Sequence, residues 1–154
     1  MNNDMARKAV YDYLALIENP PGNEAEDLQA LELALDQLAL AYHFCTYEFE
    51  DGHPAPPDRN YAHFRELAVQ HFPNFGYYNV PSVITDKIIQ AEMYVGDAID
   101  DVSEIAGDLK QVAWAWENTS ENDAIWHFRF GFDSHWGTHL RNLQGYVHAF
   151  KNRL

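Results

Sequence analysis

The spacing of hydrophobic residues predicts helices along most of the chain. Apolar side chains recur at steps of three or four residues, which gathers them on one face of a helix with 3.6 residues per turn. Stretches rich in proline, glycine and asparagine interrupt this spacing and stop the helices. The helices predicted before the C-terminal region span about Asp4 to Glu18, Glu24 to Glu50, Asn60 to Phe72 and Pro81 to Glu117.

The second predicted helix, Glu24 to Glu50, is apolar on more than one side. Its main stripe consists of Leu28, Leu31, Leu35, Leu38, Tyr42, Cys45 and Phe49. Four further apolar residues fall elsewhere around the helix, namely Leu33, Leu40, Phe44 and Tyr47. A helix of this kind lies centrally in a bundle or contributes to an oligomer interface, so a homodimer is one expectation.

The fourth predicted helix, Pro81 to Glu117, carries the longest stripe. Its members are Ile84, Ile88, Ala91, Val95, Ala98, Val102, Ile105, Leu109, Ala113 and Trp116. Gly96 and Gly107 lie within it, and each weakens a helix by about 1 kcal/mol relative to alanine and can mark a kink or break. The preceding segment, FPNFGYYNVPS, is interpreted as a loop held by its aromatic side chains, with a ligand-binding loop as the alternative.

The stretch AIWHFRFGFDSHWGTH, residues 124–139, fits two different periods. Aromatic residues alternate from Trp126 to Phe132, as they do in a half-buried strand. The helical pattern lasts longer, and its apolar positions are Ile125, Phe128, Phe132, Trp136, Leu140, Leu143, Val147 and Phe150. A lone strand would also leave backbone groups without hydrogen-bond partners. We therefore expect a helix, with His139 near the centre of the apolar stripe and His135 at its edge.

Length and composition indicate one folding unit. A chain of 154 residues with 47% hydrophobic residues can remove about 70% of its unfolded surface from water, so it needs no metal or disulfide for stability alone. No repeat, low-complexity tract or long linker divides it. The expected fold class is all-α, a single-domain helical bundle of about five helices over residues 1–154.

The charge restricts the classes of partner. Ten Lys and Arg residues against 24 Asp and Glu residues give a net charge of -14, which repels phosphate backbones and anionic membranes and attracts cations and basic proteins. We expect no nucleic-acid or membrane partner and keep a basic protein as one candidate partner, although an acidity that serves solubility alone is favoured. Cys45 is alone, which excludes an internal disulfide, and no apolar run suits a signal peptide or membrane span. These features favour a cytoplasmic location.

Two histidines raise the question of a metal site. His135 and His139 are spaced to lie side by side on a helix, where both could ligate one ion. Asp36 and His43, close together on the second predicted helix, could add ligands. However, the chain lacks the Glu-x-x-His pairs that carboxylate-rich di-metal bundles carry on two helices. We therefore expect no cofactor and histidines bonded to core carboxylates, and we keep a divalent metal as the alternative.

Four acidic residues share one face of the fourth predicted helix, namely Asp97, Asp101, Glu104 and Asp108. Like charges at these spacings each destabilise a helix by about a few tenths of a kcal/mol. Arg129, Arg141, Lys110, a divalent cation or a basic partner could compensate them, although a solvated acidic face is favoured. Nucleotide pyrophosphatases of the MazG type hold Mg²⁺ on paired acidic motifs, but their arrangement of Glu-x-x-Glu and Glu-x-x-Asp is not found.

The C-terminal stretch also holds a candidate polar cluster, formed by Arg129, Asp133, Ser134, His135, Trp136 and His139. Arg129 and Asp133, four residues apart, are predicted to form an ion pair within the helix. Together with GDAIDDVSEI at residues 96–105, the segment WHFRFGFDSHWGTH resembles a bacterial family catalogued as domain of unknown function five-zero-six-three. That family is marked by an acidic helix followed by Phe-x-Phe-Glu-Ser-His-Trp-Gly-x-His.

The resemblance covers about Gly96 to Phe150. It implies an all-helical cytosolic bacterial protein and assigns no catalytic residue, and this chain has Asp133 where the family pattern has glutamate. The leading hypothesis is therefore a non-enzymatic, acidic helical protein that binds or interacts with a partner and can be dimeric. The alternative is a metal-binding bundle or metal-dependent hydrolase that uses His135, His139 and nearby carboxylates.

Overall fold

The first two helices form a hairpin in the computed structural model, which describes residues 2–152. α1 (Asn2–Glu18) and α2 (Glu24–Phe44) pack against each other, and Asn23 begins α2 by accepting hydrogen bonds from backbone N–H groups of its first turn. The buried apolar residues of this pair include Val10, Tyr13, Leu14, Ile17, Leu31, Leu35 and Leu38. α1 agrees with the apolar spacing that predicted it, and α2 does so as far as Phe44.

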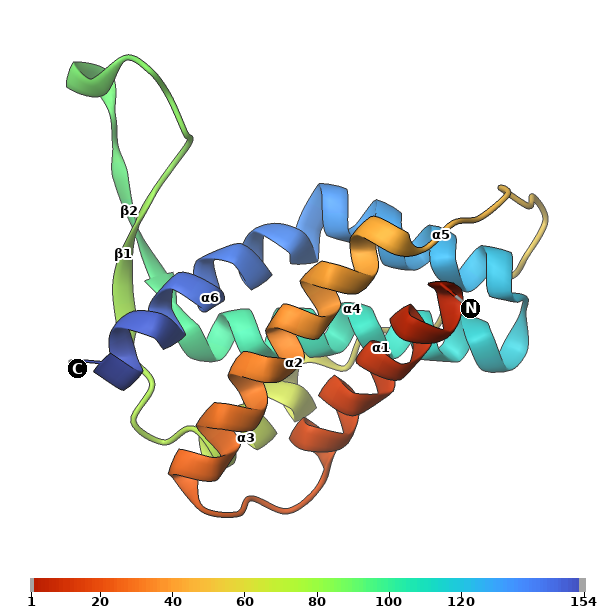
Figure 1. The fold of residues 1–154 in the computed structure, drawn as a ribbon, viewed down its shortest axis with the longest axis horizontal. Helices are drawn as coiled ribbons and strands as arrows, with labels where there is room; N and C mark the ends of the chain where they lie inside the picture. The colour runs from red at the N-terminus through yellow and green to blue at the C-terminus, as the bar shows by residue number, and fades with distance from the viewer. Residues whose placement is uncertain (1, 153–154) are drawn as a thin grey trace.

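α4 (Ala98–Asn118) is the central helix of the fold. It packs against α1, α3 (Tyr61–His71), α5 (Glu121–Gly131) and α6 (Gly137–Asn152). In Figure 1, α1 and α2 cross in front of it while α6 runs above it. Its fully buried apolar residues include Val102, Ile105 and Leu109. The prediction of a mostly helical bundle is therefore confirmed.

The C-terminal region is helical throughout its described length. α5 (Glu121–Gly131) continues through one π-helical turn, η2 (Phe132–Trp136), into α6 (Gly137–Asn152). The helix pattern thus prevails over the strand pattern in the quoted stretch, as predicted. The π turn was not predicted, because one residue added to a turn leaves the three-and-four spacing almost intact.

The second predicted helix is too long at its C-terminal end. α2 ends at Phe44, and Cys45 already has extended backbone angles of -78° and 147°. Side chains replace the helical hydrogen bonds beyond this point, since Asn3 both donates to the carbonyl of Thr46 and accepts from its N–H group. Phe49, predicted to be in the buried stripe, is 64% exposed. Cys45 itself is buried, and burial raises the pKa of its thiol.

The fourth predicted helix is wrong over its first half. Residues before Ala98 form an antiparallel hairpin of β1 (Tyr77–Pro81) and β2 (Met93–Asp97), with a short 3-10 turn, η1 (Ile88–Gln90), between them. We call Tyr77–Asp97 the arm, because Figure 1 shows it projecting from the helical bundle. Its β-branched and aromatic residues favour strands, and they occurred by chance at helical spacing. The segment FPNFGYYNVPS therefore contains a strand as well as a loop.

Aromatic side chains fix the start of the arm, as expected for this connection. Phe75 is buried, stacks on Phe72 and meets the rings of Tyr146 and Phe150 of α6 edge-on. The backbone N–H group of Gly76 donates to the hydroxyl of Tyr146 at 2.9 Å. The base of the arm is thus attached to α6.

Candidate functional site

The acidic face predicted for the fourth helix is present on α4, and it is turned toward η2 and α6. Asp97 caps the helix by accepting hydrogen bonds from the N–H groups of Ile99 and Asp100. Asp101, Glu104 and Asp108 follow on the same face at helical spacing. Asp101 is only 4% exposed, so the acidic face is partly buried and is not the solvated surface that the sequence favoured. We call the contact between these carboxylates of α4 and the η2–α6 segment the seam.

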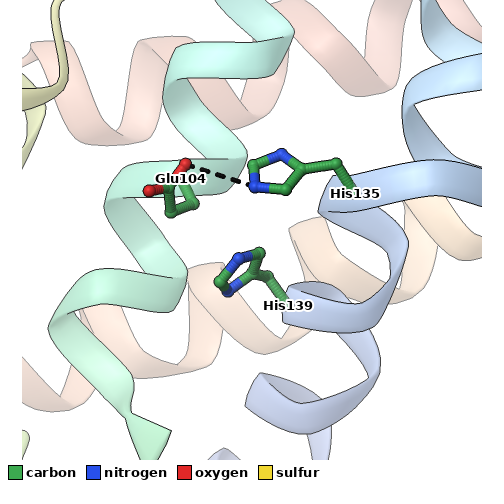
Figure 2. Close-up of side chains that lie close together, drawn as sticks. All are labelled: Glu104, His135 and His139. Atoms are coloured by element: carbon green, nitrogen blue, oxygen red, sulfur yellow. Dashed lines mark ion pairs between the residues drawn. The ribbon is translucent and has the colours of Figure 1, made fainter.

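His135 and His139 of the C-terminal stretch both point into this seam. Nδ1 of His135 lies 2.5 Å from Oδ2 of Asp108, and its Nε2 lies 3.5 Å from Oε2 of Glu104. Nδ1 of His139 lies 2.7 Å from Oδ1 of Asp101. The centres of the two rings are 5.0 Å apart, and Figure 2 shows both rings facing α4 beside Glu104. The predicted bonds between histidines and core carboxylates are therefore present.

The π turn sets the position of these rings. A β-carbon on Gly137 would lie 2.1 Å from the carbonyl oxygen of Phe132, so only glycine fits where the widened turn closes. Trp136 is fully buried and contacts the rings of Phe128 and Phe132. Burial of Trp136 on one side of η2 leaves His135 directed at α4. Single π turns of this kind are frequent at functional sites.

Arg59 is the main cation of the seam, and sequence reasoning missed it. It lies in the segment without regular secondary structure before α3, and its Nη1 donates to Glu104 at 2.7 Å and to Asp108 at 2.8 Å. The one signal in the sequence was Gly107: a β-carbon there would lie 3.1 Å from Cβ of Arg59, so the glycine makes room for this side chain. Gly107 lies inside unbroken helix and marks a contact, not a kink.

The cations that the sequence proposed as partners of this face lie elsewhere. Lys110 pairs with Glu18 of α1, and Arg141 lies over the ring of Phe132. Arg129 donates to the carbonyl of Cys45 at 2.9 Å. A second unpredicted residue, Arg65 of α3, instead donates to Asp97 at 3.0 Å.

Tyr78 of β1 connects the arm to the seam. Its hydroxyl donates to Asp101, the carboxylate that contacts His139. Burial, then the hydrogen bond to Asp101, raises the pKa of Tyr78, so the phenol keeps its proton. Burial also raises the pKa of Asp101, against the hydrogen bonds from His139 and Tyr78. Burial alone would lower the pKa of His139, but the contact with Asp101 and the nearby carboxylates raise it overall.

The side chains of the seam could hold a metal ion in two places. Glu104, His135 and His139 each offer a ligand atom within 4.8 Å of the others, and so do Asp100, Asp101 and His139. The first group is chemically the better one for a transition metal, because it contains two imidazoles and a carboxylate. Asp101 and Asp108 then hold the Nδ1 atoms of the two rings.

The ligands proposed from α2 do not join this group. Asp36 accepts a hydrogen bond from Nε2 of Gln144 at 2.9 Å. His43 is exposed, and its ring meets that of Tyr42 edge-on. Within residues 2–152, no metal-sized cluster includes either side chain. The structure thus brings together His135 and His139 with α4 instead of α2.

The candidate polar cluster divides into two parts. His135 and His139 face α4, whereas Asp133 accepts a hydrogen bond of 2.5 Å from the hydroxyl of Tyr42 on α2. The guanidinium of Arg129 lies 4.8 Å from the centre of the Tyr42 ring. Arg129 and Asp133 therefore meet through Tyr42 and not in the predicted direct ion pair. Ser134 donates to the carbonyl of Phe130 at 2.6 Å within its own helix.

Comparisons with known proteins give a family and a fold. A crystal structure of protein BF1032 from Bacteroides fragilis, a target of the Northeast Structural Genomics Consortium, superposes with a TM-score of 0.72 at 16% identity. The match covers 99% of this chain and 91% of that chain, so the two share a fold. No curated protein matches the chain. No helix among the described residues is long and apolar enough to cross a membrane.

The family model extends the resemblance seen in the C-terminal stretch. The model described as Domain of unknown function (DUF5063) matches residues 8–153, well beyond the segment of about Gly96 to Phe150 in which its pattern was visible. The seam residues of α4, η2 and α6 all fall inside the matched region, and so does Arg59. The chain belongs to the DUF5063 family, a domain of unknown function.

Proposed function

We propose that the protein binds a divalent transition-metal ion between α4 and the η2–α6 segment, with Glu104, His135 and His139 as ligands. The observation that carries this proposal is the orientation of the two rings. Each histidine turns Nδ1 toward a carboxylate of α4, which leaves Nε2 for a metal. Metal-bound histidines almost always donate their other ring N–H to a carboxylate or carbonyl, which fixes the tautomer and raises the basicity of the ligand.

The ligand set suits particular ions. Two imidazoles and one carboxylate are typical ligands of Zn²⁺ and of non-haem Fe²⁺, whereas Mg²⁺ prefers oxygen atoms alone. Three protein ligands leave coordination positions for water, and a metal-bound water is the chemistry of the hydrolase alternative. The net charge of -14 supports cation binding, because it raises the local concentration of cations.

Metal titration of the protein, purified without a histidine tag and stripped with chelator, tests the proposal. We expect one equivalent of Zn²⁺ or Fe²⁺ to bind in calorimetry and to raise the melting temperature. His135→Ala and His139→Ala each should abolish binding. Asp108→Asn should weaken it by about 10- to 100-fold, as loss of a carboxylate behind a ligand histidine does.

His43→Gln is the matched control, since His43 is exposed on α2 and its ring meets the ring of Tyr42 and not the seam. The His43→Gln variant should bind the metal ion with the same affinity as the unchanged protein. The proposal fails if Zn²⁺, Fe²⁺, Mn²⁺ and Ni²⁺ all leave the melting temperature unchanged. It also fails if both histidine variants bind as tightly as the control.

Protein binding is the second candidate function, and a different observation favours it. Large apolar side chains on the arm are exposed to solvent, including Ile84 and Ile89. Exposed apolar surface of this kind marks interaction sites on proteins. An interaction protein and a metal-binding protein are compatible here, because the arm tip and the seam use different residues.

A further inference from the structure

The arm carries the most exposed large apolar residues of residues 2–152. Ile89 is 102% exposed and Ile84 is 91% exposed. The six most exposed large apolar residues all belong to the arm, namely Ile89, Ile84, Val95, Ile88, Tyr77 and Val83. Monomeric proteins rarely expose contiguous apolar surface of this kind without a use for it.

The arm is attached only at its base. The Tyr78 hydroxyl bonds Asp101, and the N–H group of Gly76 bonds Tyr146, whereas the tip around η1 projects away from the bundle in Figure 1. An isolated two-stranded hairpin is at best marginally stable in water, and more strands or a packed face are needed to hold it. A surface that covers the apolar side chains of the arm would therefore stabilise it.

The charge of the arm argues against a basic partner at this place. The charged residues of the arm, Tyr77–Asp97, are Asp86, Lys87, Glu92 and Asp97, so the arm has a net charge of -2 while the chain has -14. A basic protein would bind more favourably to the acidic body. Two copies of this acidic chain repel each other electrostatically, and the repulsion is smallest if the weakly charged arm of one copy contacts an apolar surface of the other.

The chain itself has such a surface on the outer side of α2. We call Leu33, Leu40 and Phe44 the α2 stripe; all three are exposed, and they follow one another at steps of seven and four residues along one side of the helix. α2 was predicted to be apolar on two sides, and its inner side packs in the core. The α2 stripe is thus a second apolar surface without cover among the described residues.

We propose that two copies of the chain form a two-fold dimer in which the arm of each copy packs on the α2 stripe of the other. One arm and one stripe per chain give the equal stoichiometry that a closed two-fold interface requires. The arm spans Tyr77–Asp97, a length comparable to the roughly 20–30 residues that each partner contributes to a standard interface. This inference is independent of metal binding.

Sedimentation and light scattering at tens of micromolar test the dimer. The unchanged protein should have twice the mass of the 17.8 kDa chain. Ile84→Asp with Ile89→Asp on the arm, and Leu40→Asp on the stripe, should each give a monomer with helical circular dichroism retained. Val69→Asp is the matched control, because Val69 is exposed on α3 and belongs to neither the arm nor the α2 stripe, and this variant should remain dimeric.

Cross-linking tests which surfaces meet. An equal mixture of Ile89→Cys protein and Leu40→Cys protein should form disulfides mainly between the two variants under mild oxidation. Disulfides only between like variants would overturn the proposed arrangement. If the unchanged protein is a monomer, the dimer is wrong, and this holds also for a monomer whose arm binds phospholipid vesicles. The proposal is equally wrong if the dimer survives both the arm and the stripe substitutions.

Discussion

The ring of Tyr78 lies directly over Gly96, its partner in the β-ladder between β1 and β2. A β-carbon on Gly96 would be 2.5 Å from Cζ of this ring, which is closer than non-bonded carbon atoms approach. Glycine at position 96 therefore lets the phenol cross the hairpin and reach Asp101 on the first turn of α4. A residue of the arm thus helps to hold the carboxylate that contacts His139.

Gly96→Ala should lower the free energy of unfolding by about 1–3 kcal/mol, because the added methyl group forces the Tyr78 ring away from its position. Urea denaturation at pH 7 measures this loss. Gly145→Ala is the control, since a β-carbon on this α6 glycine meets no atom within 4 Å. It should be neutral or stabilise by up to about 1 kcal/mol, as alanine favours helix over glycine. Equal effects of the two substitutions would contradict the role given to Gly96.

Gly137→Ala should be more damaging than Gly96→Ala. Its methyl group would meet the backbone oxygen of Phe132 at 2.1 Å, and a backbone atom cannot move aside as a side-chain ring can. The π turn must therefore rearrange, which also displaces His135 from Asp108. We expect a loss of at least about 3 kcal/mol in urea denaturation, or failure to fold. A variant with unchanged stability would show that the π turn does not require glycine.

Periodicity predicted the helices well where one apolar face is buried by neighbours. α1 and α3 begin and end within about two residues of their predicted positions. The same spacing failed in the arm, where Ile84 and Ile88 lie four residues apart yet are 91% and 76% exposed. Spacing records which side chains share a face only if the segment is helical, and β-branched residues next to Pro81 favoured a strand. The helix ended early at Phe44 because side chains from α1 and α5 bond the chain beyond it.

The two halves of the candidate site were visible in the sequence, but their meeting was not. The acidic face of α4 and the pair His135 and His139 each follow from local spacing. Which helix the histidines face depends on how α4 and α6 pack, and local spacing carries no such information, so Asp36 was an equally good partner. Arg59 was missed because it comes from a proline-rich segment that has no regular secondary structure and no hydrophobic period.

The lowered pKa of the Glu50 carboxyl predicts that acid reduces the stability of the fold. Hydrogen bonds from Ser120, His53 and Asn122 lower the pKa of its carboxyl from 4.5 to about 2. A depressed carboxyl pKa contributes stability above the unfolded-state value, and this contribution is lost as the pH falls from about 4.5 through 2. Glu50→Gln should therefore be less stable than the unchanged protein at pH 6, and the difference should shrink steadily below pH 4.5. Urea denaturation between pH 6 and pH 2.5 measures it, and a difference independent of pH would contradict the assignment.

Arg59→Met should destabilise the metal-free protein more than loss of an ordinary surface cation does. The guanidinium bonds Glu104 and Asp108, whose side chains are only 17% and 14% exposed, and methionine keeps the apolar stem beside Gly107 while it leaves both carboxylates without this donor. Hydrogen bonds to charged groups contribute about 1.5–3 kcal/mol each. Because Arg59 is partly exposed, we expect the free energy of unfolding to fall by about 2 kcal/mol in total.

Lys110→Met provides the comparison for Arg59, because it breaks an ion pair with Glu18 in which both side chains are well exposed. Exposed pairs contribute about 0–1 kcal/mol, so this variant should stay close to the unchanged protein in urea denaturation with chelator present. If Arg59→Met and Lys110→Met lose equal stability, Arg59 contributes no more than an ordinary surface cation, and the expectation is wrong. A larger loss in Arg59→Met means that the carboxylates of the seam need a neighbouring positive charge, which is the condition that would also favour a bound metal ion there.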